Sequence, residues 1–265
     1  MADNKIWTLC VIILAGALLI WYVFKYVGNK KYRKAQSLDG SFIQTILQQK
    51  VAFYRQLDAE EQEQFIKRVA YFLATTIISP EKGAQVTNED RVLVAASATI
   101  PLFHFRHWSY ENLDEVLIYP GTFNEKYDTD APDRLVLGMV GDGVMNRKMI
   151  LSLASLRAGF SAHPSAGNTA IHEFVHLIDK ADGDIDGVPN YLIPDELVRP
   201  WLKEMHKTME AIRKDRSDIR DYAATNEAEF LAVVSEYFFQ KPKQLEQDHP
   251  ELYELLNEIY TPSNT

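Results

Sequence analysis

The sequence predicts an α+β fold: a mainly helical domain with a small mixed sheet, preceded by one transmembrane helix. Three observations support this prediction. Apolar residues recur at helical spacing before residue 100 and again after residue 168. Short β-branched and aromatic runs, typical of strands, lie between these two stretches. The chain also begins with an uncharged apolar run over residues 6–24.

Composition and charge narrow the class of protein. Hydrophobic residues make up 46% of the 265 residues and charged residues 25%, as in an ordinary globular protein. The net charge of -9 argues against a nucleic-acid partner, so we expect no direct nucleic-acid binding. The single cysteine, Cys10, lies in the apolar N-terminal run, so a metal bound by the rest of the chain must be held by histidines and carboxylates.

The apolar run 6–24 is interpreted as a single-pass membrane anchor. It nearly spans a bilayer core of about 30 Å, and no small-residue cleavage site of a signal peptide follows it. Five basic residues follow the run and only Lys5 precedes it, so the positive-inside rule places the large C-terminal part in the cytoplasm. The predicted divisions are an anchor with a short tail over 1–28, a basic linker over 29–40 and one domain over 41–265.

The first part of that domain, 41–110, is predicted to be helical. Apolar residues recur at helical spacing over 41–50 and 58–76, and a third helix is expected over 88–100, before Pro101. Asp58 followed by Glu61 has the arrangement of a capping box, which predicts the start of the second helix.

The remaining part, 111–265, is predicted to hold the sheet and the helices of the site. The run Glu115–Pro120 is expected to form a strand ended by a Pro-Gly turn. Residues 135–140 and 144–155 are expected to form two further strands around a hairpin turn at 141–143. Later helices are predicted over 194–213, 225–240 and 250–260.

The helix expected from Asn168 to Asp179 carries the chemistry. Asn168 is a good N-cap, and His172 and His176 in the pattern H-E-x-x-H lie one turn apart on the same face. Both imidazoles can therefore bind one Zn²⁺, and Glu173 can reach a water held on it as a general base. The alternative is a core helix with two histidines by accident, which chance gives in roughly one in a hundred such chains.

A catalytic zinc site needs a third protein ligand. Asp179 and Asp182 stand where the three-histidine class has glycine and histidine after H-E-x-x-H, which excludes that class. Glutamates of the helix at 225–240 are the other candidates. Glu227 points about 160° away from Glu229, whereas Glu229 and Glu236 share one face, and periodicity alone leaves both of these as possible ligands.

Four segments together resemble the Mlc titration factor A family of zinc peptidases. These are DEVLIYP at 114–120, HEFVHLID at 172–179, DYAATNEAEF at 221–230 and SEYFF at 235–239, and the resemblance extends over about 42–260. The TNEAEF run is also similar to the catalytic centre of anthrax lethal factor. The family's best-known member lacks the N-terminal apolar run, so the anchor is a departure from it.

This resemblance implies a gluzincin-like zinc metallopeptidase domain. It implies that Glu229 joins His172 and His176 as the third zinc ligand. It also implies that Tyr222, seven residues before Glu229, stabilises the transition state. A fourth residue, Asp179, could accept a hydrogen bond from a zinc histidine or simply end its helix.

The expected function is a membrane-anchored, zinc-dependent peptidase that cuts peptide or protein substrates with a metal-activated water. In peptidases of this layout the strand before the metal helix commonly pairs with an extended substrate, which suggests Lys148–Ser155 for that role. The alternative, also implied by the resemblance, is a regulator-binding module that sequesters a transcriptional repressor with weak or no proteolysis. A purely structural zinc site is disfavoured because such sites usually have four protein ligands.

Overall fold

The structure is a computed structural model of the chain. It describes residues 16, 18 and 21 and the range 38–262, apart from 125, 130–134, 142, 162–166 and 191. The predicted membrane anchor at 6–24 lies almost entirely outside the described residues, as does most of the linker at 29–40. Within the described part, no helix is both long enough and apolar enough to cross a membrane.

The N-terminal part contains the three predicted helices and one further short helix between the first two. It contains α2 (Gly40–Lys50), α3 (Ala52–Gln56), α4 (Ala59–Thr75) and α5 (Asn88–Thr99). The predicted capping box is present, because Asp58 accepts from the backbone of Glu61 and the Glu61 carboxylate accepts from the backbone N–H of Asp58. Helix α5 is almost entirely buried, and α2, α4, α6 and α7 pack around it.

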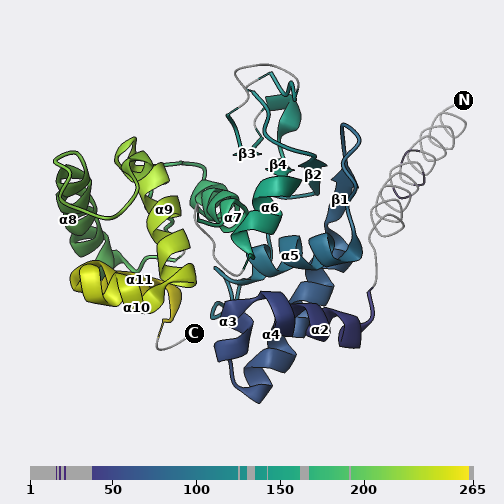
Figure 1. Cartoon of the computed structure of the whole chain (residues 1–265), viewed down its shortest axis with the longest axis horizontal. Coiled ribbons are helices and arrows are strands. Elements are labelled where there is room, and N and C mark those ends of the chain that lie inside the picture. Colours follow the sequence, from purple (N-terminus) through teal and green to yellow (C-terminus); the bar gives the residue numbers. More distant parts are fainter. Residues whose placement is uncertain are drawn as a thin grey trace, which may run out of the picture.

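The sheet is mixed, in the strand order β1-β2-β4-β3 (Figure 1). Strands β1 (Ile77–Pro80), β2 (Glu115–Tyr119) and β4 (Lys148–Ser152) run parallel, and β3 (Gly138–Val140) is antiparallel to β4. Strand β1 is not predicted by any sequence pattern, since its short IISP run follows α4 directly and offers no alternation.

The strand expected over 144–155 is shorter than its sequence suggested. Gly143–Met145 form a 3-10 turn, and Ser152 ends the strand by capping α6 (Leu153–Gly159), where its hydroxyl accepts from the N–H of Ser155. Strand β4 is also paired on both sides, so the expectation that Lys148–Ser155 offers an edge to substrate is wrong. The edge of the sheet on this side is β3.

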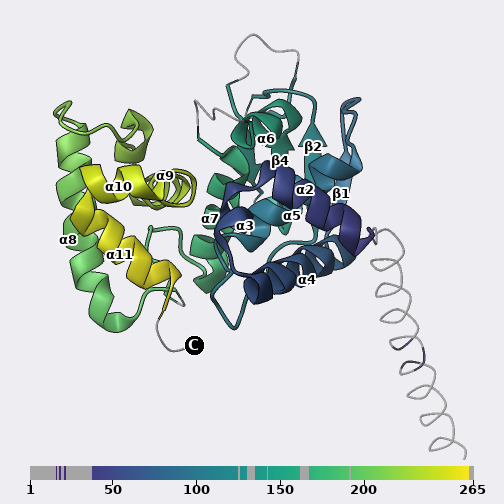
Figure 2. The same cartoon turned by 60° about the horizontal axis from the view of Figure 1, so that its bottom comes forward.

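Helix α7 (Thr169–Asp179) lies between two groups of elements, as both views show (Figures 1 and 2). The sheet and α2–α6 lie on one side. On the other lie α8 (Asp195–Ile212), α9 (Glu227–Gln240), α10 (Pro242–Asp248) and α11 (Pro250–Tyr260). One hydrophobic core runs through both groups, so most of α7 is buried, including the polar residues His172, Glu173 and Asp179.

Candidate metal centre

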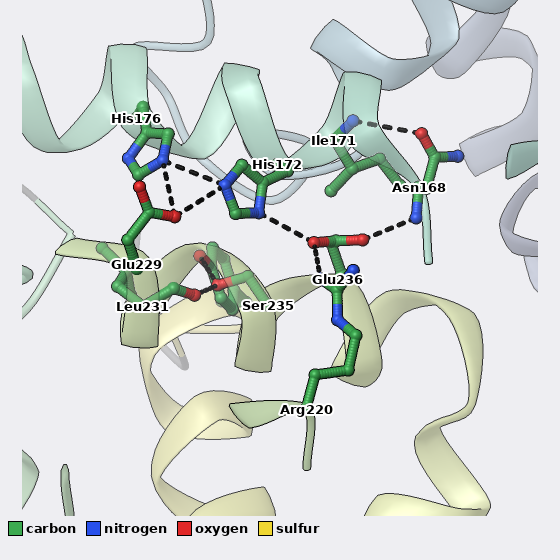
Figure 3. Close-up of polar contacts among 10 residues, drawn as sticks. Asn168, Ile171, His172, His176, Arg220, Glu229, Leu231, Ser235 and Glu236 are labelled. Carbon is green, nitrogen blue, oxygen red and sulfur yellow. Dashed lines mark hydrogen bonds and ion pairs between the residues drawn. The ribbon is translucent and has the colours of Figure 1, made fainter. Parts of the chain in front are cut away.

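The two residues directly before helix α7 fix its start. The Asn168 side chain accepts from the backbone N–H of Ile171 at 3.2 Å, so it is the predicted N-cap. Gly167 before it has a φ of +83°, a conformation that favours glycine. The helix then presents His172 and His176 toward α9, which packs along it (Figure 3).

Three potential ligand atoms converge between α7 and α9. His172 Nε2 lies 3.0 Å from Glu229 Oε2 and 3.1 Å from His176 Nε2, and His176 Nε2 lies 3.4 Å from Glu229 Oε2 (Figure 3). Ligands at about 2.0–2.1 Å from a tetrahedral zinc ion are about 3.3 Å apart. The donor set and its spacing therefore fit a divalent metal such as zinc. Among the residues that the structure describes, no other group of this kind occurs.

The second ring nitrogen of His172 faces the other candidate glutamate. His172 Nδ1 lies 2.8 Å from Glu236 Oε1, and Glu236 is almost fully buried. When the imidazole is neutral, as a metal ligand must be, Nδ1 donates to this carboxylate and Nε2 carries a lone pair on the side of Glu229 and His176. The structure thus separates the two glutamates that periodicity left equivalent: Glu229 faces both Nε2 atoms, whereas Glu236 lies behind His172.

The electrostatics of this cluster favour a cation. Burial opposes a proton on His172, but hydrogen bonds to Glu229 and Glu236 outweigh it and raise the pKa of His172 to about 10. Burial also acts against the charge of Glu229, yet its hydrogen bonds to the two histidines hold its pKa well below the usual range. Two carboxylates around one imidazole thus create a point where positive charge is stabilised.

Glu173 is buried on the same helix, next to strand β3. Only 6% of the residue is exposed, and burial raises the pKa of its carboxyl. A Cβ added to Gly138 of β3 would lie 2.6 Å from Glu173 Cγ and Oε1, so the close approach of the strand requires a glycine there. A carboxylate held in this way beside a metal site is suited to accept a proton from water.

Tyr222 lies at the exposed side of the cluster, on a 3-10 turn, η3 (Asp221–Ala224), that packs on α9. Its ring centroid is 6.1 Å from that of His172, and 52% of the residue is exposed. Partial burial and the charge of Glu229 raise the pKa of Tyr222 to about 12. At neutral pH the hydroxyl is therefore protonated and can donate a hydrogen bond.

Of the two roles considered for Asp179, the structure supports the one at the end of its helix. Its Oδ2 accepts from the backbone N–H of Gly187 at 3.0 Å, so it holds the acidic turn 182–187 against the end of α7. Burial raises the pKa of Asp179 to about 6. The carboxylate that contacts a site histidine is instead Glu236, which the sequence had offered only as an alternative ligand.

The fold and the site together define a metallopeptidase-type domain, in which an H-E-x-x-H helix is completed by a glutamate from a later helix. The model of the family described as glucose-regulated metallo-peptidase M90 matches residues 28–261, so the chain belongs to that family. Together with the similarity to proteins named Mlc titration factor A, this match confirms the predicted resemblance to that family.

Relatives match most of the chain. An Mlc titration factor A of Escherichia fergusonii is 30% identical and one of Pectobacterium atrosepticum 28%, each over 77% of this chain and 80% of the relative. An uncharacterized protein of Synechocystis sp. is 27% identical over 82% of both chains.

Proposed function

We propose that the chain hydrolyses peptide bonds as a zinc-dependent peptidase. The observation that carries this proposal is the position of Glu173. Its buried carboxylate follows His172 directly in the helix that presents two imidazoles toward Glu229. A metal site that only stabilised the fold would not need a free carboxylate beside it, and it would usually have a fourth protein ligand.

In this proposal His172, His176 and Glu229 hold Zn²⁺. The ion, when bound, supplies Lewis acidity toward a water molecule and the scissile carbonyl. Glu173 accepts a proton from the attacking water and delivers it to the leaving amine. Tyr222 donates its hydroxyl to the carbonyl oxygen as that oxygen gains charge in the transition state.

The substrate is a peptide or a protein segment in extended conformation, and we place it along β3. This strand is at the edge of the sheet and touches Glu173 through Gly138. Leu135 and Leu137, just before β3, are exposed apolar side chains that could contact a substrate. Backbone hydrogen bonds to a strand edge would bind a substrate without demanding a particular sequence.

We further propose that residues 6–24 anchor the protein in the membrane as a single span, with the catalytic domain in the cytoplasm. The support is the unbroken apolar run and the basic residues that follow it. Such an anchor would restrict the peptidase to substrates at or near the membrane surface.

A second candidate function is the binding of a transcriptional regulator. The support for it is the name of the relatives, Mlc titration factor A, which describes proteins that titrate Mlc. For this chain the partner would be a transcriptional regulator sequestered by the same domain, and binding could coexist with proteolysis.

The deciding experiment measures hydrolysis of a broad library of quenched fluorescent peptides by the full-length chain in detergent. We expect cleavage that a chelator abolishes and added Zn²⁺ restores. Glu173→Gln should retain zinc and lose activity by about 10²- to 10⁴-fold, since it removes the general base. Glu246→Gln, an exposed position on α10, is the matched control. Stoichiometric zinc in a chain that cuts no peptide would favour the binding function.

A further inference from the structure

We propose that Glu236 is a positioning residue of the metal centre, and that it links His172 to the segment that carries Tyr222. This inference rests on the zinc site proposed above, but Glu236 itself would bind neither the metal nor the substrate. It follows from three hydrogen bonds that meet at one buried carboxylate (Figure 3).

Both oxygens of Glu236 are occupied. Oε1 accepts from His172 Nδ1 at 2.8 Å and from an Arg220 Nη atom at 2.6 Å, and Oε2 accepts from the backbone N–H of Asn168 at 2.6 Å. The residue is 3% exposed, and a buried carboxylate is costly unless it is neutralised and fully hydrogen-bonded. The three donors meet that condition, so the side chain has one well-defined position.

The bond to His172 determines how this histidine can act. A hydrogen bond from Nδ1 selects the tautomer whose Nε2 carries the lone pair, and it fixes the rotation of the ring. Glu236 thereby aims Nε2 at the point that His176 and Glu229 also face. Because Glu229 and Glu236 lie on one face of α9, a single helix presents a metal ligand and the carboxylate that orients another.

The bond to Arg220 extends this arrangement to the exposed side of the site. Arg220 immediately precedes η3, and Tyr222 is two residues further on. The Arg220 guanidinium balances the charge of Glu236 and ties the start of η3 to α9. Glu236 thus connects the start of α7, a metal-binding histidine and the turn that carries Tyr222.

Gly167 provides independent support for a close fit around Glu236. A Cβ at this position would lie 2.1 Å from Glu236 Oε2 and 3.3 Å from an Arg220 Nη atom, and the φ of +83° is itself unfavourable for other residues. The chain therefore has its smallest residue where the backbone passes the carboxylate. Any larger side chain would push Glu236 away from His172 or Asn168.

The test compares Glu236→Gln with Glu227→Gln in the full-length chain. Gln has one acceptor oxygen for the three donors, so either His172 or Asn168 loses its partner. Glu227 is on the same helix but is half exposed, and serves as the matched control. Zinc affinity is measured by competition with a chromogenic chelator, and ligand geometry by the visible absorption of the Co²⁺-substituted protein.

For Glu236→Gln we expect zinc affinity to fall about 10- to 100-fold, with an altered Co²⁺ spectrum, and for Glu227→Gln we expect neither change. Glu236→Ala removes every acceptor at this position. Wild-type affinity and spectrum in both Glu236→Gln and Glu236→Ala, with only a lower melting temperature, would mean that the carboxylate merely stabilises the fold and would overturn the inference. If Glu236→Gln does not fold, Glu236→Asp decides in the same way, because its shorter side chain cannot reach His172 and Asn168 together.

These measurements do not depend on peptide hydrolysis. If the wild-type chain binds zinc but cuts no peptide, the proposed peptidase function fails, while the comparison of zinc affinities still decides the role of Glu236.

Discussion

His172 lies between two glutamates, one at each ring nitrogen, and this arrangement gives the two carboxylates different chemistry. Glu229 lies next to the Nε2 atoms of the two histidines, whereas Glu236 accepts hydrogen bonds from Arg220 and from the backbone of Asn168. A cation at the Nε2 side would be bound by Glu229 directly. Glu236 would not bind this cation and would act on it through the imidazole of His172, which lies between them.

Replacing Glu229 should therefore remove most of the metal affinity. In Glu229→Ala we expect zinc affinity to fall by more than about 100-fold, beyond the effect of an orienting residue. The measurement is zinc content by atomic absorption after dialysis against buffered zinc. Normal zinc retention in Glu229→Ala would show that this glutamate is not a ligand.

Tyr222→Phe tests the transition-state contact. The phenol is half exposed, so removing its oxygen should leave folding and zinc content unchanged. If the hydroxyl acts only on the developing charge, kcat should fall about 10- to 10³-fold with little change in KM. A raised KM at constant kcat would instead indicate a contact with the bound substrate.

Residue patterns predicted part of this site and left the rest open. The histidine pair and Glu173 follow from spacing on one helix. The choice between Glu229 and Glu236 does not follow from spacing, because both lie on one face of α9. Only the way α9 packs along α7 decides which of them faces the Nε2 atoms of the histidines. Arg220 and Gly167 carried no signal of their own, since their importance arises from contacts with Glu236 that are distant in sequence.

At the scale of elements, strand β3 and helix α7 determine the environment of Glu173. Gly138 permits the strand to lie against the carboxylate. Helical stretches with caps were predictable from local signals, as the capping box of α4 illustrates. Strands were less predictable from local signals. Strand β1 is stabilised by pairing with β2, and β4 ends early because Ser152 caps α6. Neither effect can be recognised from the alternation of apolar and polar residues.

Gly138→Ala should displace Glu173 without removing a ligand. A Cβ 2.6 Å from the carboxylate must move either the side chain or the strand. We expect kcat/KM for peptide hydrolysis to fall at least about tenfold, with zinc content unchanged. Gly121→Ala, where an added Cβ meets nothing within 4 Å, is the control. Full activity in Gly138→Ala would show that Glu173 tolerates displacement.

At the scale of the whole molecule, an ion pair between two helices adds to the stability that the core provides. Asp90 of α5 is 2% exposed and binds Arg157 of α6 through two bonds of 2.7 and 2.8 Å. Burial works against the charge of Asp90, but the bonds from Arg157 and Thr87 outweigh it and lower its pKa. The pair joins the helix at the centre of the N-terminal group to the helix that follows the sheet.

This pair should make stability depend on pH in a defined direction. Because the folded pKa of Asp90 lies below its ordinary value of 3.8, its stabilisation is complete above that pH and is lost as the pH falls through the lower folded value. We expect Asp90→Asn to cost about 2 kcal/mol in urea unfolding at pH 7. The difference from wild type should shrink as the pH falls below 3.8, whereas exposed Asp195→Asn should change little at either pH.

The position of α7 between two groups of elements has a consequence for folding. His172 and Glu229 are 57 residues apart in sequence, so an ion bound to both closes a loop that contains α8 and η3. Closing such a loop costs the unfolded chain conformational entropy, and the ion acts as a removable cross-link between α7 and α9. When a chelator withdraws it, α8 and η3 should open to hydrogen exchange before the sheet and α5 do.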